Sequence, residues 1–279
     1  MSLKADYQRD GYVFPLPAMS EAEARSYRAK LESAEQQHPG FVQQTSGYVS
    51  LAIDFVDELA RLDAVLEPVA EILGDDLLVW GTNLFIKNAK SLDFVSWHQD
   101  LTYWGLDDAD EVTAWIALSP ATVASGCMRF IRGTHELPIV EHRDTFEQSN
   151  LLSRGQEIVA DIDETKAVDV VLSPGEFSLH HGRIFHASHA NTSDERRIGL
   201  AIRYVSPRMR QAGDTRTMAH LVRGHDEFGH FELAPPPVGV MAPVDVERVS
   251  KAHSLQQGYT YAGAEEAGKR VLMQGPGSN

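Results

Sequence analysis

In the first third of the chain, the order of apolar and polar residues favours helices that bury one face. Ser20 and Glu23 have the Ser-x-x-Glu form of a capping box, in which each side chain satisfies an unpaired amide at a helix start. This predicts a helix that begins at Ser20 and runs to about Gln37. The sequence His38-Pro39-Gly40 is expected to end it.

A second helical stretch is predicted from about Val56 to Leu73, with Gly74 as the residue that ends it. Pro68 lies inside this stretch. Because proline removes a helix hydrogen bond and clashes with the preceding turn, we expect a break there into two short helices.

From Leu77 onward the pattern changes to short apolar runs separated by turns that contain glycine. Such runs read as strands, and the clearest cover residues 77–80, 111–118, 168–172 and 198–205. No helical pattern alternates with them, which favours an antiparallel barrel or sandwich over an alternating α/β sheet. The expected organisation is one domain over residues 1–279, with a helical N-terminal layer (about 1–75), a barrel core (about 77–207) and a C-terminal wrap (208–279).

Composition narrows the possible functions. The 279 residues include 25 Lys and Arg against 40 Asp and Glu, a formal net charge of −15, which argues against nucleic-acid binding. No apolar run approaches the ~18 residues of a membrane span, and the N-terminus lacks the apolar segment of a signal peptide. Cys127 is the single cysteine, so an intrachain disulfide, a Cys-ligated zinc site and an iron–sulfur cluster are excluded. We expect a cytoplasmic protein with no evident obligate protein partner.

The first candidate for chemistry is the pair His98 and Asp100. On a strand, residues i and i+2 point to the same face, so the imidazole and the carboxylate would offer two adjacent ligands for a divalent metal. A second histidine from another strand would complete a facial triad that leaves about three coordination positions open. A His-x-Asp tripeptide also arises by chance, so surface polar residues remain the alternative.

The second candidate is a histidine cluster in residues 180–189, which comprises His180, His181, His186 and His189. One of them would suffice as the third ligand, and periodicity does not choose among them; histidines that are solvated or satisfied in the core remain the alternative. Arg197 then leads into the apolar run 198–202. An arginine there can hold a carboxylate through two hydrogen bonds in a dry site, or form a salt bridge at the barrel rim.

Three features follow one another along the chain: the pair His98 and Asp100, the histidine cluster, and Arg197. In this order they resemble the phytanoyl-CoA dioxygenase family of non-haem Fe(II)/2-oxoglutarate oxygenases. The resemblance runs from about residue 83 to 207 and includes segments 96–101, 114–118, 126–135 and 186–197. It implies a mainly β fold with N-terminal helices, a double-stranded β-helix (a jelly-roll, cupin-like barrel). The family pattern places the co-substrate arginine eleven residues after the distal histidine, which implies His186 as third ligand and Arg197 as the grip on the distal carboxylate.

The resemblance also implies a hydroxylase that uses Fe(II), 2-oxoglutarate and O₂ and releases succinate and CO₂. Ser188 matches a hydroxyl that supports the co-substrate carboxylate, and Trp115 an aromatic that packs on the co-substrate, although a core role suits Trp115 almost as well. Asn83 and Thr102 are weaker candidates for this pocket. Relatives that halogenate carry a small residue in place of the carboxylate, so Asp100 favours hydroxylation.

The substrate is a small molecule whose class the sequence indicates only broadly. A basic group is expected at the pocket mouth: Arg129, Arg132, His135, His180, Arg183 and His189. Arg132 stands where the family loop usually has proline. An anion-binding mouth favours a small polar or anionic metabolite, such as an amino acid or an aminoalkylphosphonate, whereas rim charges paired with acidic residues are the alternative. Tyr103 and Trp104 could frame an apolar or cationic part of the substrate.

Three other functions remain open at this stage. The enzyme could hydroxylate an acyl-CoA or a terpenoid acid. It could be a non-oxidative, cupin-like isomerase or hydrolase that uses the same ligands with zinc or manganese, which would form no succinate and would not need Arg197. It could also be a non-catalytic barrel that binds small ligands or serves as a scaffold.

Overall fold

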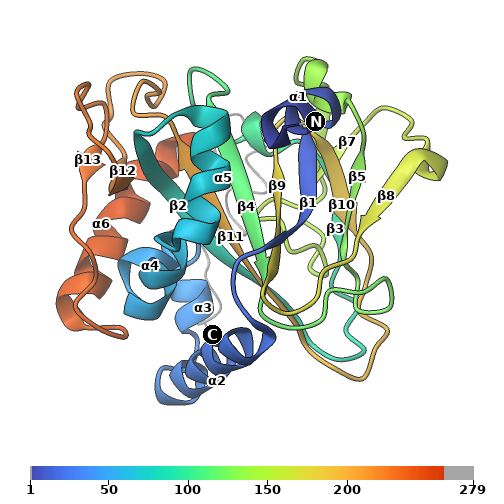
Figure 1. Cartoon of the computed structure of the whole chain (residues 1–279), viewed down its shortest axis with the longest axis horizontal. Coiled ribbons are helices and arrows are strands. Elements are labelled where there is room, and N and C mark those ends of the chain that lie inside the picture. Colours follow the sequence, from blue (N-terminus) through green and yellow to red (C-terminus); the bar gives the residue numbers. More distant parts are fainter. Residues whose placement is uncertain (1, 261–279) are drawn as a thin grey trace.

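The computed structural model describes residues 2–260, and two β-sheets that pack against each other form its centre (Figure 1). The larger sheet has the order β1 (Tyr12–Pro17), β9 (Glu176–His180), β4 (Glu111–Ala117), β11 (Arg197–Val205), β2 (Leu77–Lys87), β12 (Met218–Arg223) and β13 (Glu232–Leu233). The smaller sheet has the order β3 (Val95–His98), β10 (Phe185–Ser188), β5 (Met128–Ile131) and β8 (Ala167–Val170). Strands β6 (His142–Asp144) and β7 (Gln156–Ile158) form a separate pair. All these pairs are antiparallel except β12 with β13, which confirms the predicted jelly-roll class.

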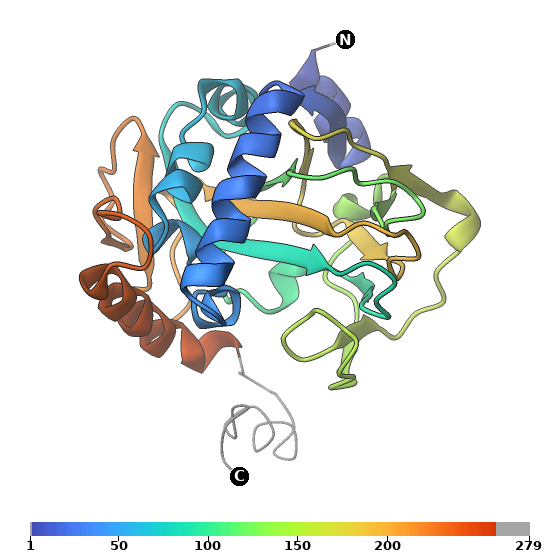
Figure 2. The same cartoon turned by 90° about the horizontal axis from the view of Figure 1, so that it is seen from below.

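Helices cover the outer face of the larger sheet (Figures 1 and 2). The helices are α1 (Leu3–Asp10), α2 (Glu21–Gln37), α3 (Phe41–Gln44), α4 (Asp54–Ala60), α5 (Asp63–Leu73) and α6 (Pro243–Thr260). Short 3-10 helices span Val49–Leu51, Asp100–Thr102, Thr134–Glu136 and Glu164–Lys166. The described residues contain no helix that is long and apolar enough to cross a membrane.

The central strands β4 and β11 are buried along their whole length, because each of their faces is covered. On β11, Ile198, Leu200 and Ile202 pack into the main core between the sheet and the helices. Ala201, which alternates with them, belongs to a second core cluster between the two sheets. Burial on both faces explains why this strand reads as a continuous apolar run rather than an alternating one.

Helix α2 begins as predicted. The Ser20 hydroxyl accepts a hydrogen bond from the Glu23 amide (3.3 Å), and the Glu23 carboxylate accepts one from the Ser20 amide (2.8 Å). The helix ends at Gln37, directly before the predicted stop.

The predicted break at Pro68 was wrong, because Pro68 lies inside the continuous helix α5. The chain breaks instead at Arg61 and Leu62, where Tyr204 donates a hydrogen bond to the carbonyl of Ala60 (2.9 Å) and so satisfies the end of α4. Proline in a helix interior costs about 3 kcal/mol. Burial of Val65, Leu66 and Val69 of the same helix offsets this cost.

Two strands cross the expected layer boundaries. Strand β1, within the predicted helical layer, forms one edge of the larger sheet, a position that tolerates its two prolines. Strand β12, within the predicted C-terminal wrap, pairs with β2 in the same sheet. The last part of that wrap, residues 261–279, lies outside the described residues.

The approach of Trp115 to strand β11 generates a first prediction. A Cβ atom on Gly199 would lie 1.8 Å from Cζ2 of Trp115, a ring that is itself buried. Gly199→Ala is therefore expected to lower the free energy of unfolding by about 1–3 kcal/mol, the usual cost of overpacking a core. Urea denaturation of both proteins measures this difference.

Gly239→Ala is the matched control, since a Cβ at Gly239 meets nothing within 4 Å. Equal stability losses in the two variants would show that the contact with Trp115 does not constrain the residue at position 199.

Candidate active site

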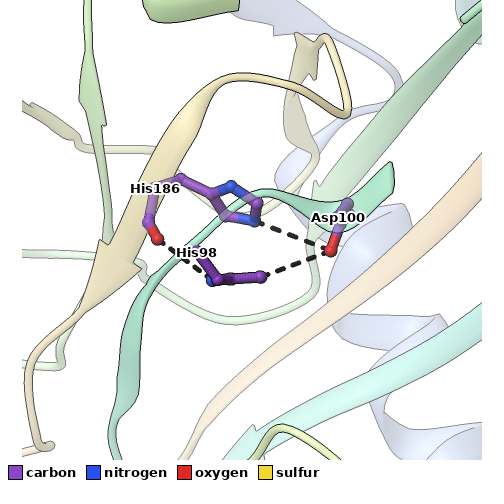
Figure 3. A group of neighbouring side chains, drawn as sticks. All are labelled: His98, Asp100 and His186. Atoms are coloured by element: carbon purple, nitrogen blue, oxygen red, sulfur yellow. Dashed lines mark hydrogen bonds and ion pairs between the residues drawn. The ribbon is translucent and has the colours of Figure 1, made fainter. Parts of the chain in front are cut away.

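Neighbouring strands of the smaller sheet bring two histidines together. His98 and His186 are direct cross-strand partners on β3 and β10, and their ring centroids lie 3.9 Å apart. Strand β3 ends at His98, so Asp100 reaches the same place from the start of the following 3-10 helix rather than from a strand (Figure 3). The Asp100 Oδ1 atom lies 3.3 Å from His98 Nε2 and 4.0 Å from His186 Nε2.

The hydrogen bonds of both imidazoles suit metal binding. His98 Nδ1 lies 2.9 Å from the carbonyl oxygen of Ser96 and 3.1 Å from that of His186, and His186 Nδ1 lies 3.0 Å from that of Ile184. These contacts require the proton on each Nδ1, which leaves each Nε2 lone pair free toward Asp100. The potential ligand atoms of the three residues all lie within 4.8 Å of one another. Two imidazoles and a carboxylate are the donor set of a facial triad, so the residues fit a ferrous ion.

Local electrostatics favour the same protonation states. Burial opposes ionisation of Asp100, but its contact with His98 and the positive charge of nearby Arg203 outweigh this effect, so the pKa of Asp100 is lowered. Burial and the neighbouring His98 lower the pKa of His186. A charged carboxylate and a neutral imidazole are the forms that bind metal.

The pocket that these ligands line extends toward Arg197, the first residue of β11. Arg197 is buried, donates a hydrogen bond to the carbonyl of Gly126 (2.8 Å), and lies over the Trp115 ring at 5.3 Å. Burial lowers its pKa to about 10, so the guanidinium stays charged at neutral pH. Ser188, two residues after His186, lines the same pocket.

A second buried cation, Lys87, was missed by the sequence analysis. Lys87 lies directly opposite Arg197 in the β2–β11 pair, and its Nζ donates hydrogen bonds to Ser188 Oγ (2.6 Å) and to the carbonyl of His189. Burial, reinforced by the charge of Arg197, lowers its pKa to about 7. The available signal was a lone lysine that ends the apolar run 84–86.

Two cavities meet at the triad. The inner pocket contains Trp115, Ser188 and Arg197 with the three potential ligands, and the outer cleft, of about 1370 Å³, runs from the triad to the 39–48 segment and helix α6. Residues that line both are Phe85, His98, Asp100, Leu152 and Arg203. Of the predicted residues, His180 lines the inner pocket, whereas Asn83, Tyr103 and Trp104 line the cleft.

Most residues of the predicted basic mouth lie away from the two cavities, and two of its arginines are paired with carboxylates. Arg129 lies 2.6 Å from a Glu164 carboxylate oxygen and also contacts His189, and Arg132 pairs with Asp10. The residues that line neither cavity are Thr102, Arg129, Arg132, His135, Arg183 and His189. Carboxylates from the helix α1 end and the 164–169 segment neutralise the arginines, so the alternative of paired rim charges describes them better.

The histidine cluster divides by strand geometry. His180 packs beside His186, with ring centroids 5.2 Å apart, and burial lowers its pKa to about 4. His181 faces the opposite way, toward Tyr7 and His135, and burial lowers its pKa to about 3. Neither belongs to the group of residues close enough to hold a metal together.

Comparisons with known proteins identify relatives of the same kind. A curated protein of Stutzerimonas stutzeri, named a probable alpha-ketoglutarate-dependent hypophosphite dioxygenase, is 28% identical over 158 residues, which are 56% of this chain and 54% of that protein. A Caenorhabditis elegans homologue of phytanoyl-CoA dioxygenase domain-containing protein 1 is 34% identical over 123 residues, 42% of each chain. The chain thus matches about half the length of these curated relatives.

Solved structures match over more of the chain. The non-heme monooxygenase ThoJ without ligand is 34% identical, with a TM-score of 0.83 over 94% of this chain and 98% of that one. Its nickel complex is 31% identical, with a TM-score of 0.78 over 94% and 99%. The names of these relatives agree with the predicted class of enzyme. The model of the phytanoyl-CoA dioxygenase (PhyH) family matches residues 7–199, well over half of the sequence, and the chain belongs to this family.

Proposed function

We propose that this protein is a Fe(II)/2-oxoglutarate-dependent dioxygenase that hydroxylates a small-molecule substrate and releases succinate and CO₂. One observation carries the proposal: His98, Asp100 and His186 converge in a pocket that also contains the buried Arg197. Ser188 of the same pocket accepts a hydrogen bond from the buried Lys87. A metal triad alone suits many reactions. A triad combined with a cationic site for a second carboxylate suits a chelating keto-diacid.

Each group has a distinct task in this proposal. The two Nε2 atoms and the Asp100 carboxylate would hold iron, and three protein ligands would leave room for the oxo acid and O₂. Arg197 and Lys87 bind the distal carboxylate, the Ser188 hydroxyl orients it, and Trp115 packs beside it. When bound, a ferrous ion would supply the chemistry that couples oxidative decarboxylation of 2-oxoglutarate by O₂ to hydroxylation of the substrate. Because Asp100 occupies the ligand position that halogenating relatives leave free, hydroxylation is the favoured outcome.

For the substrate, we propose an anionic small molecule, with the amino acid or aminoalkylphosphonate type from the sequence analysis as the starting hypothesis. The name of the Stutzerimonas relative supports an anion, since hypophosphite carries negative charge. Hydroxylation of an acyl-CoA or a terpenoid acid is the alternative. The net charge of −15 and the single, buried Cys127 support action in the cytoplasm without nucleic acid.

The decisive experiment separates this function from non-oxidative metal chemistry and from a ligand-binding barrel. Purified protein is incubated with Fe(II), 2-oxoglutarate and O₂, and succinate is measured by mass spectrometry. Succinate that requires all three components supports the proposal, and its absence with every candidate substrate contradicts it. Turnover of a substrate with zinc or manganese in the absence of 2-oxoglutarate would favour the cupin-like alternative.

A second prediction concerns the metal ligands. His98→Ala, Asp100→Ala and His186→Ala are each expected to lose stoichiometric Fe(II) binding, because three ligands hold the ion. Their loss of turnover is expected to exceed the ~10–100-fold effect typical of removing a group that only supports a ligand. Anaerobic equilibrium dialysis measures iron retention. His181→Ala is the control, and equal iron retention in the ligand variants and the control would contradict the assignment.

A third prediction concerns pH. Lys87 binds a carboxylate only when protonated, and its pKa is lowered to about 7. The affinity of the Fe(II) protein for 2-oxoglutarate is therefore expected to fall as the pH rises through about 7. Lys87→Met should bind 2-oxoglutarate weakly even at low pH, and its affinity should depend little on pH. Arg197→Gln should also bind 2-oxoglutarate weakly, but the pH at which its affinity falls should be higher, because the charge of Arg197 lowers the pKa of Lys87. Anaerobic calorimetric titrations between pH 6 and 9 measure these affinities. An affinity of the unmodified protein that is independent of pH would contradict the role of Lys87.

A further inference from the structure

Arg203 is a buried arginine without a carboxylate partner. It is 8% exposed and makes no ion pair among residues 2–260. Its Nη1 donates a hydrogen bond to the neutral side chain of Asn83, its guanidinium lies over the Trp104 ring at 5.1 Å, and its Nε has no hydrogen-bond partner in the same range. The charges of Asp100 and Glu111 only partly offset the effect of burial, which lowers the pKa of Arg203. A group that binds there is therefore expected to be an anion.

The position of Arg203 distinguishes it from the co-substrate site. Arg197 and Arg203 lie on the same face of β11, six residues or about 20 Å apart along the strand. Gly199 and Ala201 lie between them on this face. Trp115 packs against Gly199, and Ala201 lines the inner pocket. Arg197 lines the inner pocket but not the cleft, whereas Arg203 lines both. Arg203 therefore stands where the triad opens to the cleft.

The cleft has walls that suit an apolar body. Aromatic side chains of Phe41, Tyr48, Trp80 and Trp104 line it, together with Leu84 and Ile86. Its second arginine, Arg196, already pairs with Glu35 (2.8 Å), which leaves Arg203 as the arginine of the cleft that lacks a carboxylate. A volume of about 1370 Å³ exceeds the ~300–1000 Å³ of common ligand pockets, so a molecule larger than a free amino acid fits.

Several residues that line this cleft lie outside the region matched by the family model, which ends at residue 199. Arg203 follows that point, and Ser250, His253 and Gln256 of helix α6 also line the cleft. The inner pocket, in contrast, consists mainly of residues within the family model. This division is expected when the chemistry is shared by the family and the substrate is particular to the chain.

We propose that the cleft binds the oxidisable substrate as an amphipathic carboxylate, whose charged group pairs with Arg203 beside the metal and whose apolar body packs against the aromatic walls. This inference rests on the proposed function and deepens it: among the anionic substrates considered there, it favours a carboxylic acid with an apolar body over a free amino acid. The competing occupant of Arg203 is the metal-chelating carboxylate of 2-oxoglutarate, which carries the same charge. The experiment must therefore keep the co-substrate bound throughout.

The test uses the full chain, loaded anaerobically with Fe(II) and saturating 2-oxoglutarate. The probes are cyclohexyl- and adamantyl-alkanoic acids of increasing chain length, each paired with its neutral primary amide. Tryptophan fluorescence reports binding, because Trp80 and Trp104 line the cleft and Trp104 lies under Arg203. At least one acid is expected to bind about 10-fold or more tightly than its amide, the ratio expected of a desolvated, charge-assisted pair.

In Arg203→Gln this preference should fall to about 2-fold or less. Asn83→Asp is a second variant that keeps the guanidinium on Trp104 but gives it a carboxylate partner, and it should lose the preference in the same way. Arg223→Gln, a partly buried arginine already paired with Glu67 and outside both cavities, is the matched control and should keep it.

Three results would overturn the inference. The first is the absence of any preference for acids over amides in the unmodified protein. The second is an unchanged preference in both Arg203→Gln and Asn83→Asp. The third is a loss of 2-oxoglutarate affinity in Arg203→Gln, measured by calorimetry, with the preference for acids retained, which would assign Arg203 to the co-substrate. A protein that binds no 2-oxoglutarate at all would refute the proposed function instead, so the two failures are distinguishable.

Discussion

Strand β11 carries charged side chains on one face while its other face is sealed against helices, and the site depends on this constraint. Ile198, Leu200 and Ile202 fix the strand in the main core, so the residues between them must face the space between the sheets. Arg197 and Arg203 are consequently held in places from which neither can reach bulk water easily. If anions bind as proposed, they would recover part of the free energy lost by burying these arginines, so ligand binding would also stabilise the fold.

The charges around the triad explain why anion binding should become more favourable once a metal ion is bound. The negative charges of Asp100 and Glu111 oppose the effect of burial on the Arg203 guanidinium. A divalent ion would bind the Asp100 carboxylate and add positive charge, so anions would bind more favourably at both ends of the inner pocket. In the proposed function, a keto-diacid would supply the anion at one end, at Arg197 and Lys87. An anionic group of the substrate at Arg203 would supply the anion at the other end.

The sequence could predict what short-range patterns specify. The strand β11, the capping box of α2 and the convergence of His98 with Asp100 follow from spacing, and the family pattern singled out His186. Lys87 and Arg203 could not be found this way, because their importance comes from cross-strand register and from the lack of a partner. The pairing of Arg129 and Arg132 could not be predicted for the same reason, since their carboxylate partners come from distant segments. The uninterrupted α5 shows that tertiary burial can override the local cost of Pro68.

A buried hydrogen-bond network gives the cleft a fixed wall. Ser50 Oγ lies 3.1 Å from His220 Nε2, and His220 Nδ1 lies 3.1 Å from Asp57 Oδ1, an order of groups found in hydrolases. All three side chains are buried and line neither cavity, so a substrate cannot reach the serine. The Ser50 amide and hydroxyl also bond Thr82 of β2, which ties the turn after the cleft-lining Tyr48 to two strands of the larger sheet. Because such networks hold backbone in a single arrangement, the cleft edge is set by the same sheet that positions Arg203.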